Sequence, residues 1–159
     1  MGFADSYFTA AIGAIPEIFF ADIDRDVPGW WDFRQNLDEI RKELGGTYQY
    51  FKEEAKVWQL FLERANNFAK EFEDVTVILD STNLTNKYRK MYLESTPLFD
   101  KHILVYFDVS FERACERNLS RHEMKVVPHY AMERLYDELE PVDQETINLY
   151  DEYIEIKIA

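Results

Sequence analysis

The sequence predicts an α/β domain in which a parallel sheet of about five strands is flanked by helices. Residues 75–79 (VTVIL) and 102–109 (HILVYFDV) are runs of mostly β-branched, aliphatic and aromatic residues. Such continuous runs are typical of strands buried on both faces of a parallel sheet. Segments with the apolar period of a helix alternate with them. Because no linker, repeat or low-complexity tract interrupts this pattern, residues 1–159 are expected to form a single domain.

In the first half of the chain, two short apolar runs are expected to be strands, and one long amphipathic segment is expected to be a helix. Residues 7–12 form a run closed by Gly13, and residues 30–33 form another after a Pro-Gly turn dipeptide. From residue 48 to residue 72, apolar side chains recur at three- and four-residue steps. This spacing indicates one long helix.

In the second half, helices follow each predicted strand. A polar segment over residues 83–93 is expected to be helical. Ser110 is a good N-cap for a helix after the strand at 102–109, and another helix is expected after Pro128. Residues 154–158 alternate isoleucine with charged side chains, which predicts an edge strand.

Charge and composition narrow the classes of partner. A formal net charge of −13 opposes binding to bulk nucleic acid, because unspecific affinity comes from neutralising phosphates with Lys and Arg. A small nucleotide or an oligonucleotide end is still a possible ligand where basic residues cluster. The only cysteine, Cys115, rules out an internal disulfide, and no stretch approaches the roughly 18 apolar residues of a membrane span. We therefore expect a cytoplasmic protein without membrane attachment, and leave a protein partner and the oligomeric state open.

The first candidate site follows the predicted strand at 75–79. The residues there are Asp80, Ser81, Thr82 and Asn83, which offer a carboxylate, two hydroxyls and an amide at the carboxyl end of a strand. That position and these oxygen atoms suit a metal or a phosphate. The alternative is that Asp80 or Ser81 caps the next helix.

The second candidate site is a row of arginines. Arg113, Arg117 and Arg121 are spaced four residues apart and are expected to line one helix face in an otherwise acidic chain. Guanidinium groups bind phosphate oxygens in pairs and stabilise the charge of a transferring phosphoryl group. The alternative is a solvated face whose arginines pair with Glu112 and Glu116.

The third candidate site is a carboxylate next to an arginine. Asp38 and Arg41 lie one helical turn apart, so their side chains would project together. A carboxylate that accepts a hydroxyl proton, next to an arginine that holds a phosphate, suits the acceptor site of a phosphoryl transfer. The alternative is a plain surface ion pair.

These segments occur in a recognisable order along the chain. DxxR is followed by hhhDSTNL (h, hydrophobic), then by ERNxxR and finally by VVPxxxxxRxYxxxE, over residues 28–142. In this order they resemble the P-loop kinases of the polynucleotide kinase type and related small ATP-dependent kinases. The resemblance implies a P-loop kinase-like three-layer sandwich. It also implies transfer of the γ-phosphoryl group of ATP to a hydroxyl, such as a nucleic-acid 5′-OH.

The resemblance also assigns roles. It implies that Asp38 is the general base, that Arg41 holds the phosphate of the acceptor, and that Arg117 and Arg121 reach the donor phosphates from a lid that ends at Val127-Pro128. It implies ATP and Mg²⁺ as cofactors. The residues that it places next to the nucleotide are Gly13, Thr82 and Asn83, with Asp80 at the metal.

The donor loop departs from the family pattern. After Gly13 the chain reads AIPEIFFAD, so the second glycine, the lysine and the hydroxyl of G-x-x-x-x-G-K-[ST] are all absent. Pro16 lacks an N–H donor and Glu17 repels phosphate, whereas a working loop wraps the phosphates with successive N–H groups and a lysine. The first lysine of the chain is Lys42. ATP binding is therefore expected to be impaired.

Three functions follow from these observations. The first is phosphoryl transfer in which Arg117, Arg121 and a metal at Asp80 compensate for the altered loop. The second is a non-catalytic module that binds a nucleotide or a partner. The third takes FFADIDRDV as the start of a phosphatase of the haloacid dehalogenase type, with Asp22 as nucleophile, Asp24 as acid/base and Mg²⁺ as partner.

Overall fold

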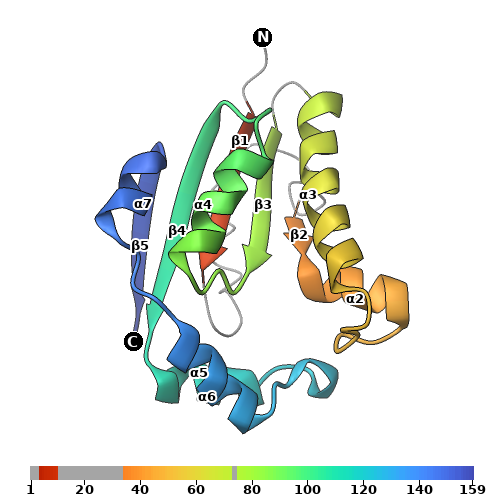
Figure 1. The fold of residues 1–159 in the computed structure, drawn as a ribbon. Helices are drawn as coiled ribbons and strands as arrows, with labels where there is room; N and C mark the ends of the chain where they lie inside the picture. Colours follow the sequence, from red (N-terminus) through yellow and green to blue (C-terminus); the bar gives the residue numbers. More distant parts are fainter. Residues whose placement is uncertain (1–3, 11–33, 73–74) are drawn as a thin grey trace.

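The computed structural model describes residues 4–10, 34–72 and 75–159. Its centre is a five-stranded sheet in the order β2-β3-β1-β4-β5, in which all neighbouring strands are parallel (Figure 1). The strands are β1 (Ala4–Ala10), β2 (Arg34–Asn36), β3 (Val75–Ser81), β4 (Lys101–Val109) and β5 (Glu152–Ile158). The predicted α/β fold with a parallel sheet of about five strands is therefore confirmed.

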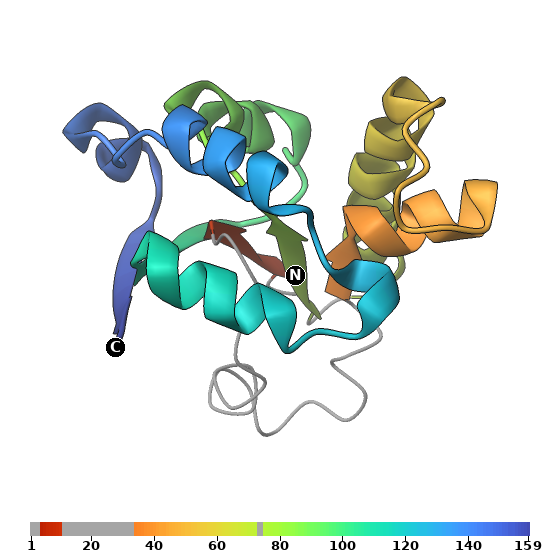
Figure 2. The same ribbon diagram turned by 90° about the horizontal axis from the view of Figure 1, so that it is seen from below.

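Helices connect and flank the strands. They are α2 (Leu37–Gly45), α3 (Glu54–Glu71), α4 (Asn86–Ser95), α5 (Phe111–Leu119), α6 (His129–Glu138) and α7 (Gln144–Leu149), with a 3₁₀ helix, η2, at Glu123–Lys125. Figures 1 and 2 show that α3, α4 and α7 lie on one face of the sheet. No helix in the described part of the chain is long and apolar enough to span a membrane.

The core explains why the apolar runs form strands. Side chains of β3 alternate between two apolar clusters: Val75, Val77 and Leu79 pack with Phe61 of α3, whereas Ile78 belongs to a second cluster. That second cluster includes Ile103, Val105 and Phe107 of β4, with the isoleucines of β5 packed against it. Both faces of β3 and β4 are thus apolar, as expected for inner strands of a parallel sheet.

Several element boundaries differ from the predicted ones. The long helix begins at Glu54 and not at residue 48, because α2 ends at Gly45. The left-handed φ of 79° at its C-cap residue, Gly46, turns the chain, and residues 47–53 connect the two helices. The first strand, Ala4–Ala10, begins three residues before the predicted start at residue 7, and residues 11 and 12 of the predicted run lie outside the described residues. The run at residues 30–33 lies outside the described residues.

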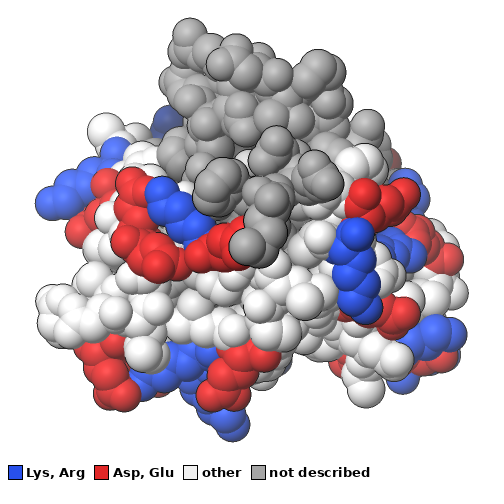
Figure 3. All heavy atoms as spheres, turned by 90° about the horizontal axis from the view of Figure 1, so that it is seen from above, with Lys and Arg blue, Asp and Glu red and all other residues white. Residues whose placement is uncertain are grey.

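The parallel strands place one edge of the sheet next to several functional segments. The arrowheads of β1 and β3 point toward α5 and α6, and Figure 2 views this carboxyl edge directly. The chain leaves β1 toward β2 and leaves the adjacent β4 toward β5, so the connections diverge there. Ligands of open α/β sheets bind outside such a switch point. On the described surface of the opposite edge, acidic and basic side chains are interspersed (Figure 3).

Candidate functional site

The junction of β2 and α2 brings together the carboxylate of Asp38 and the guanidinium of Arg41, the pair predicted from the sequence. Asn36 caps α2: its Oδ1 accepts the backbone N–H groups of Asp38 at 2.8 Å and of Glu39 at 3.3 Å. One turn later, Arg41 Nη1 donates to Asp38 Oδ1 at 2.8 Å. Arg41 also donates Nε and Nη2 to the two carboxylate oxygens of Glu54, at 2.8 and 2.9 Å. Asp38 and Arg41 therefore lie side by side, as their spacing predicts.

Arg41 is well held in this position. Its side chain is only 14% exposed, and its guanidinium lies over the ring of Phe51, 5.1 Å from the centroid. Burial by itself lowers the pKa of Arg41, but the hydrogen bonds and charges of Glu54 and Asp38 outweigh it and raise the pKa. The site thus contains a fixed positive charge whose three donor nitrogens point at carboxylates. Carboxylate and phosphate present similar oxygen geometry to such a fork.

The predicted row of three arginines on one helix is wrong in part. Helix α5 ends at Leu119, so Arg121 lies beyond it, and Arg121 Nη2 is 3.9 Å from Asp38 Oδ2. Arg113 pairs with Glu116 at 2.9 Å on the exposed face, as the alternative reading expected. Arg117 is half-buried on α5, where burial first and the charge of Arg113 second lower its pKa. Of the three, Arg121 is the one next to Asp38.

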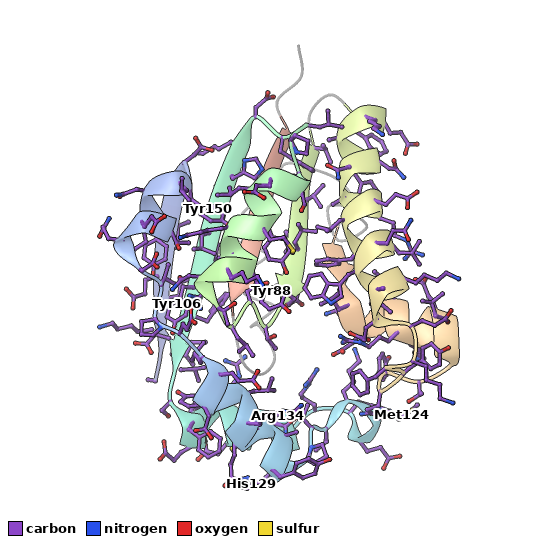
Figure 4. All side chains as sticks on the ribbon, viewed as in Figure 1. Tyr88, Tyr106, Met124, His129, Arg134 and Tyr150 are labelled. Atoms are coloured by element: carbon purple, nitrogen blue, oxygen red, sulfur yellow. The ribbon has the colours of Figure 1, made fainter. Side chains whose placement is uncertain are left out.

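The segment that carries Arg121 reaches across to α2. Lys125 Nζ donates to Glu39 Oε1 at 2.9 Å and lies over the ring of Tyr48 at 4.7 Å from the centroid. Gln49 Nε2 donates to the carbonyl of Met124 at 3.0 Å, and Figure 4 shows Met124 next to α2. We call residues 119–126 the lid segment. Its contacts join residues more than 70 positions apart in the chain.

One buried side chain closes the lid segment at its base. Asn118 is 3% exposed, and its amide binds both backbone groups of Val127: Nδ2 donates to the carbonyl at 2.7 Å, and Oδ1 accepts the N–H at 2.9 Å. Pro128 then caps α6. The two ends of the lid segment are therefore held together by a pair of hydrogen bonds.

The end of β3 contributes Asp80 to the same edge. Asp80 pairs with Asn36 in the ladder between β3 and β2, and Asn36 Nδ2 donates to Asp80 Oδ2 at 3.1 Å. Thr82 is exposed, whereas Asn83 is 3% exposed and its Oδ1 accepts a hydrogen bond from Ser81 Oγ. Neither Asp80 nor Ser81 caps the next helix, because Thr85 does. Within the described residues, no three His, Cys, Asp or Glu side chains form a group that could hold a metal ion.

Arg89 is a residue that the sequence did not reveal. It is completely buried on α4 and donates to the carbonyls of Asn83 at 3.0 Å, Leu84 at 3.2 Å and Glu140 at 2.8 Å. Tyr150, labelled in Figure 4, donates from its hydroxyl to the carbonyl of Arg89. Burial lowers the pKa of Arg89. These contacts fix the turn that follows Asp80.

The last of the four sequence motifs, VVPxxxxxRxYxxxE, also has structural contacts. Tyr136 donates its hydroxyl to the carbonyl of Val109 at the end of β4, and a Glu140 side-chain oxygen accepts the N–H of Asn86 at the start of α4. Arg134, which is labelled on α6 in Figure 4, has an exposed side chain. Two of the three defining side chains therefore hold the carboxyl edge together. The predicted loop residue Gly13 and the acids Asp22 and Asp24 lie outside the described residues.

Comparison with known proteins identifies the fold. No protein-family model matches the sequence, and no curated protein matches it. Among solved structures, the chain is similar to shikimate kinase from Acinetobacter baumannii in complex with shikimate, with a TM-score of 0.54 and 16% sequence identity. The alignment covers 99% of this chain and 86% of the shikimate kinase chain. The chain therefore has a P-loop kinase-like fold.

Proposed function

We propose that this domain binds an acceptor molecule with a hydroxyl and a phosphate at its carboxyl edge, and that Asp38 is the general base of a phosphoryl transfer to that hydroxyl. The observation that carries the proposal is the position of Asp38 between two arginines. Its Oδ1 is bound by Arg41 and its Oδ2 faces Arg121 at 3.9 Å. The polynucleotide kinase type of acceptor, a nucleic-acid 5′-OH, belongs to this proposal on the sequence resemblance alone.

In the proposed reaction, the acceptor oxygen attacks the γ-phosphorus of ATP and the bond from that phosphorus to the ADP oxygen breaks. The hydroxyl proton passes to the carboxylate of Asp38. Glu54 anchors Arg41 through Nε and Nη2, and Nη1, which binds Asp38, is offered to a phosphate that replaces Asp38 as its partner. Among the described residues the side chain of Arg121 makes one ion pair, the long contact with Asp38, so it can turn toward a phosphate at little cost.

The residues at this edge fit ATP and Mg²⁺ in part. Asp80 would hold Mg²⁺, because its carboxylate stands at a strand end and oxygen atoms are the ligands that Mg²⁺ prefers. Arg117 and Arg121 would hold the phosphates of ATP, and the exposed hydroxyl of Thr82 lies at the same strand end. Bound Mg²⁺ would neutralise charge on the transferring group. Asn83 does not fit a role at the nucleotide, because its side chain is buried and bonded to Ser81.

A second function is favoured by the sequence after Gly13. The lysine and hydroxyl of the phosphate loop are absent, and the residues that replace them include Pro16 and Glu17. A chain that lacks these groups can keep the arginines of the acceptor side and bind an anionic ligand without transferring phosphate. We therefore propose a non-catalytic binding module as the competing function.

The experiment that tests the proposal measures label transfer from ATP with Mg²⁺ to a 5′-hydroxyl oligonucleotide. Asp38→Asn is expected to lower transfer by about 100-fold or more, the usual range for a lost general base. Asp100→Asn, an exposed carboxylate at the other edge of the sheet, is the matched control and should keep transfer.

The competing functions give different results in the same series. A wild-type chain that transfers no label but is thermally stabilised by ATP or by the oligonucleotide would support the binding module and reject the kinase. Hydrolysis of an aryl phosphate that is lost in Asp22→Asn would reject both and support the phosphatase.

A further inference from the structure

Asn36 uses one side-chain amide to make two different kinds of contact. Its Oδ1 accepts the N–H groups of Asp38 and Glu39 at 2.8 and 3.3 Å, and its Nδ2 donates to Asp80 Oδ2 at 3.1 Å. Asn36 and Asp80 are direct partners in the ladder between β2 and β3. The amide therefore connects the first turn of α2 with a carboxylate that lies 44 residues away in the sequence.

Few side chains can make both contacts. Asp and Ser are equally good N-caps, but Asp has no donor for a carboxylate, and Ser has a single oxygen that must serve both partners. An amide separates its acceptor and donor on two atoms. The N–H that points at Asp80 is charge-assisted, since the acceptor is a carboxylate. The chemistry of the position thus calls for Asn where helix capping alone would accept several residues.

We propose that Asn36 is a positioning residue that holds Asp38 and Asp80 in one fixed arrangement. This inference rests on the proposed function, in which Asp38 is the base and Asp80 faces the metal. Asn36 itself touches neither reacting atom. It binds the backbone N–H of Asp38 and one oxygen of Asp80, so a change at the Asp80 carboxylate is transmitted to the backbone from which Asp38 projects.

Nuclear magnetic resonance tests whether Asn36 links Asp80 to the first turn of α2, through the backbone amide resonances of that turn. Asp80→Ala is expected to shift the backbone amide resonances of Asp38 and Glu39, because Asn36 loses the partner of its N–H and turns. In an Asn36→Ser background, where the cap persists without the amide, Asp80→Ala should leave the Asp38 and Glu39 resonances unmoved. Asp143→Asn is the matched control. It exchanges the N-cap of α7, the helix that precedes β5, and β5 is the outer strand on the other side of the sheet from β2.

A kinetic measurement separates positioning from folding. Asn36→Ser is expected to lower kcat for label transfer by about tenfold with KM for the oligonucleotide unchanged, the size of effect seen when an outer hydrogen-bond partner of a metal site is removed. Asn36→Ala removes the cap as well as the bond to Asp80, so it should lower the melting temperature more than Asn36→Ser does.

The outcomes distinguish this inference from the proposed function. Unmoved Asp38 and Glu39 resonances in Asp80→Ala would overturn the role of Asn36 even if the wild-type chain transfers label. Conversely, a wild-type chain without transfer would reject the proposed kinase, while shifted resonances would still show that Asn36 couples the Asp80 carboxylate to the first turn of α2. An equal loss of melting temperature in Asn36→Ser and Asn36→Ala would also overturn the inference, because it would show that the residue acts on stability alone.

Discussion

Two largely buried arginines of this domain have opposite surroundings. Arg41 donates to the carboxylates of Asp38 and Glu54, and these charges raise its pKa. Arg89 donates to three backbone carbonyls and to the side-chain oxygen of Asn86, and burial lowers its pKa. An arginine paired with carboxylates can exchange one of them for a phosphate. An arginine that satisfies backbone carbonyls cannot leave them without unfolding the turn that it supports.

The largest loss of stability is expected when Arg89 is substituted. Arg89→Met should lower the free energy of unfolding by at least about 3 kcal/mol, because several buried acceptors lose their donor at about 1–3 kcal/mol each. Urea denaturation measures it. The control is Arg113→Met, an exposed partner of Glu116, with an expected change below about 1 kcal/mol. Similar losses in both variants would show that the contacts of Arg89 are dispensable.

Substitution of Arg41 should lower the free energy of unfolding less than substitution of Arg89 does, and should weaken ligand binding more. Arg41→Met is expected to lower the free energy of unfolding by about 1.5–3 kcal/mol, the range for hydrogen bonds to charged groups. It should also weaken binding of a 5′-phosphorylated oligonucleotide, measured by calorimetry. Arg41→Lys keeps the charge without the fork and should recover only part of that binding. Full recovery by lysine would contradict the proposal that a guanidinium anchored by Glu54 is needed to present a nitrogen to the phosphate.

Lowering the pH should destabilise the folded protein through His102, which lies on the same side of the molecule as Arg89. His102 Nε2 lies 2.9 Å from Thr96 Oγ1, and burial lowers its pKa despite the Thr96 carbonyl and the charge of Asp151. The folded protein thus holds His102 neutral, and the unfolded chain binds the proton first as the pH falls below about 6.5.

Stability should therefore fall with decreasing pH in that window, by at most about 1.4 kcal/mol per pH unit from this group. Denaturation at pH values between 7 and 5 measures the slope. His102→Gln should have a smaller slope over the same range. An identical slope in the variant would assign the acid sensitivity to other groups.

The smallest predicted effect is that of salt on the ion pair between Lys125 and Glu39, next to the proposed acceptor site. Lys125 and Glu39 are 2.9 Å apart with side chains 33% and 50% exposed, so a double-mutant cycle with Lys125→Ala and Glu39→Gln should give a coupling of about 0.2–1 kcal/mol. At 1 M salt the screening length is about 3 Å, and the coupling should vanish. A coupling that persists in high salt would mean that the lid segment is held by its uncharged contacts.

Sequence patterns predicted the inner strands because strands that are buried on both faces consist of consecutive apolar residues. Both faces of β3 and β4 are apolar, and Ser110 caps α5 as its type and position indicated. The described strand β2, Arg34–Asn36, directly follows the strand predicted at residues 30–33, and its three residues are polar and pair with β3. Local pattern therefore predicts elements with their own apolar period, whereas polar residues such as those of β2 give no such signal and join the sheet through their pairing with β3.

The candidate site divides in the same way. Asp38 and Arg41 were found because their partnership depends on helical spacing. The roles of Asn36 and Arg89 were missed because their decisive partners, Asp80 and Glu140, are 44 and 51 residues away. Arg121 was placed on the wrong element because the pattern of four-residue steps continues past the point where α5 ends.

The amide of Asn118 has a consequence for how this domain can change over time. Because it binds both backbone groups of Val127, it acts like one rung of a sheet ladder and joins the ends of the lid segment. Residues inserted between these two positions would leave α5 and α6 in place, at a cost of about 0.6 kcal/mol for each doubling of loop length. The part of the chain that faces Asp38 and Glu39 can therefore be exchanged as a unit, without disturbing the sheet that carries it.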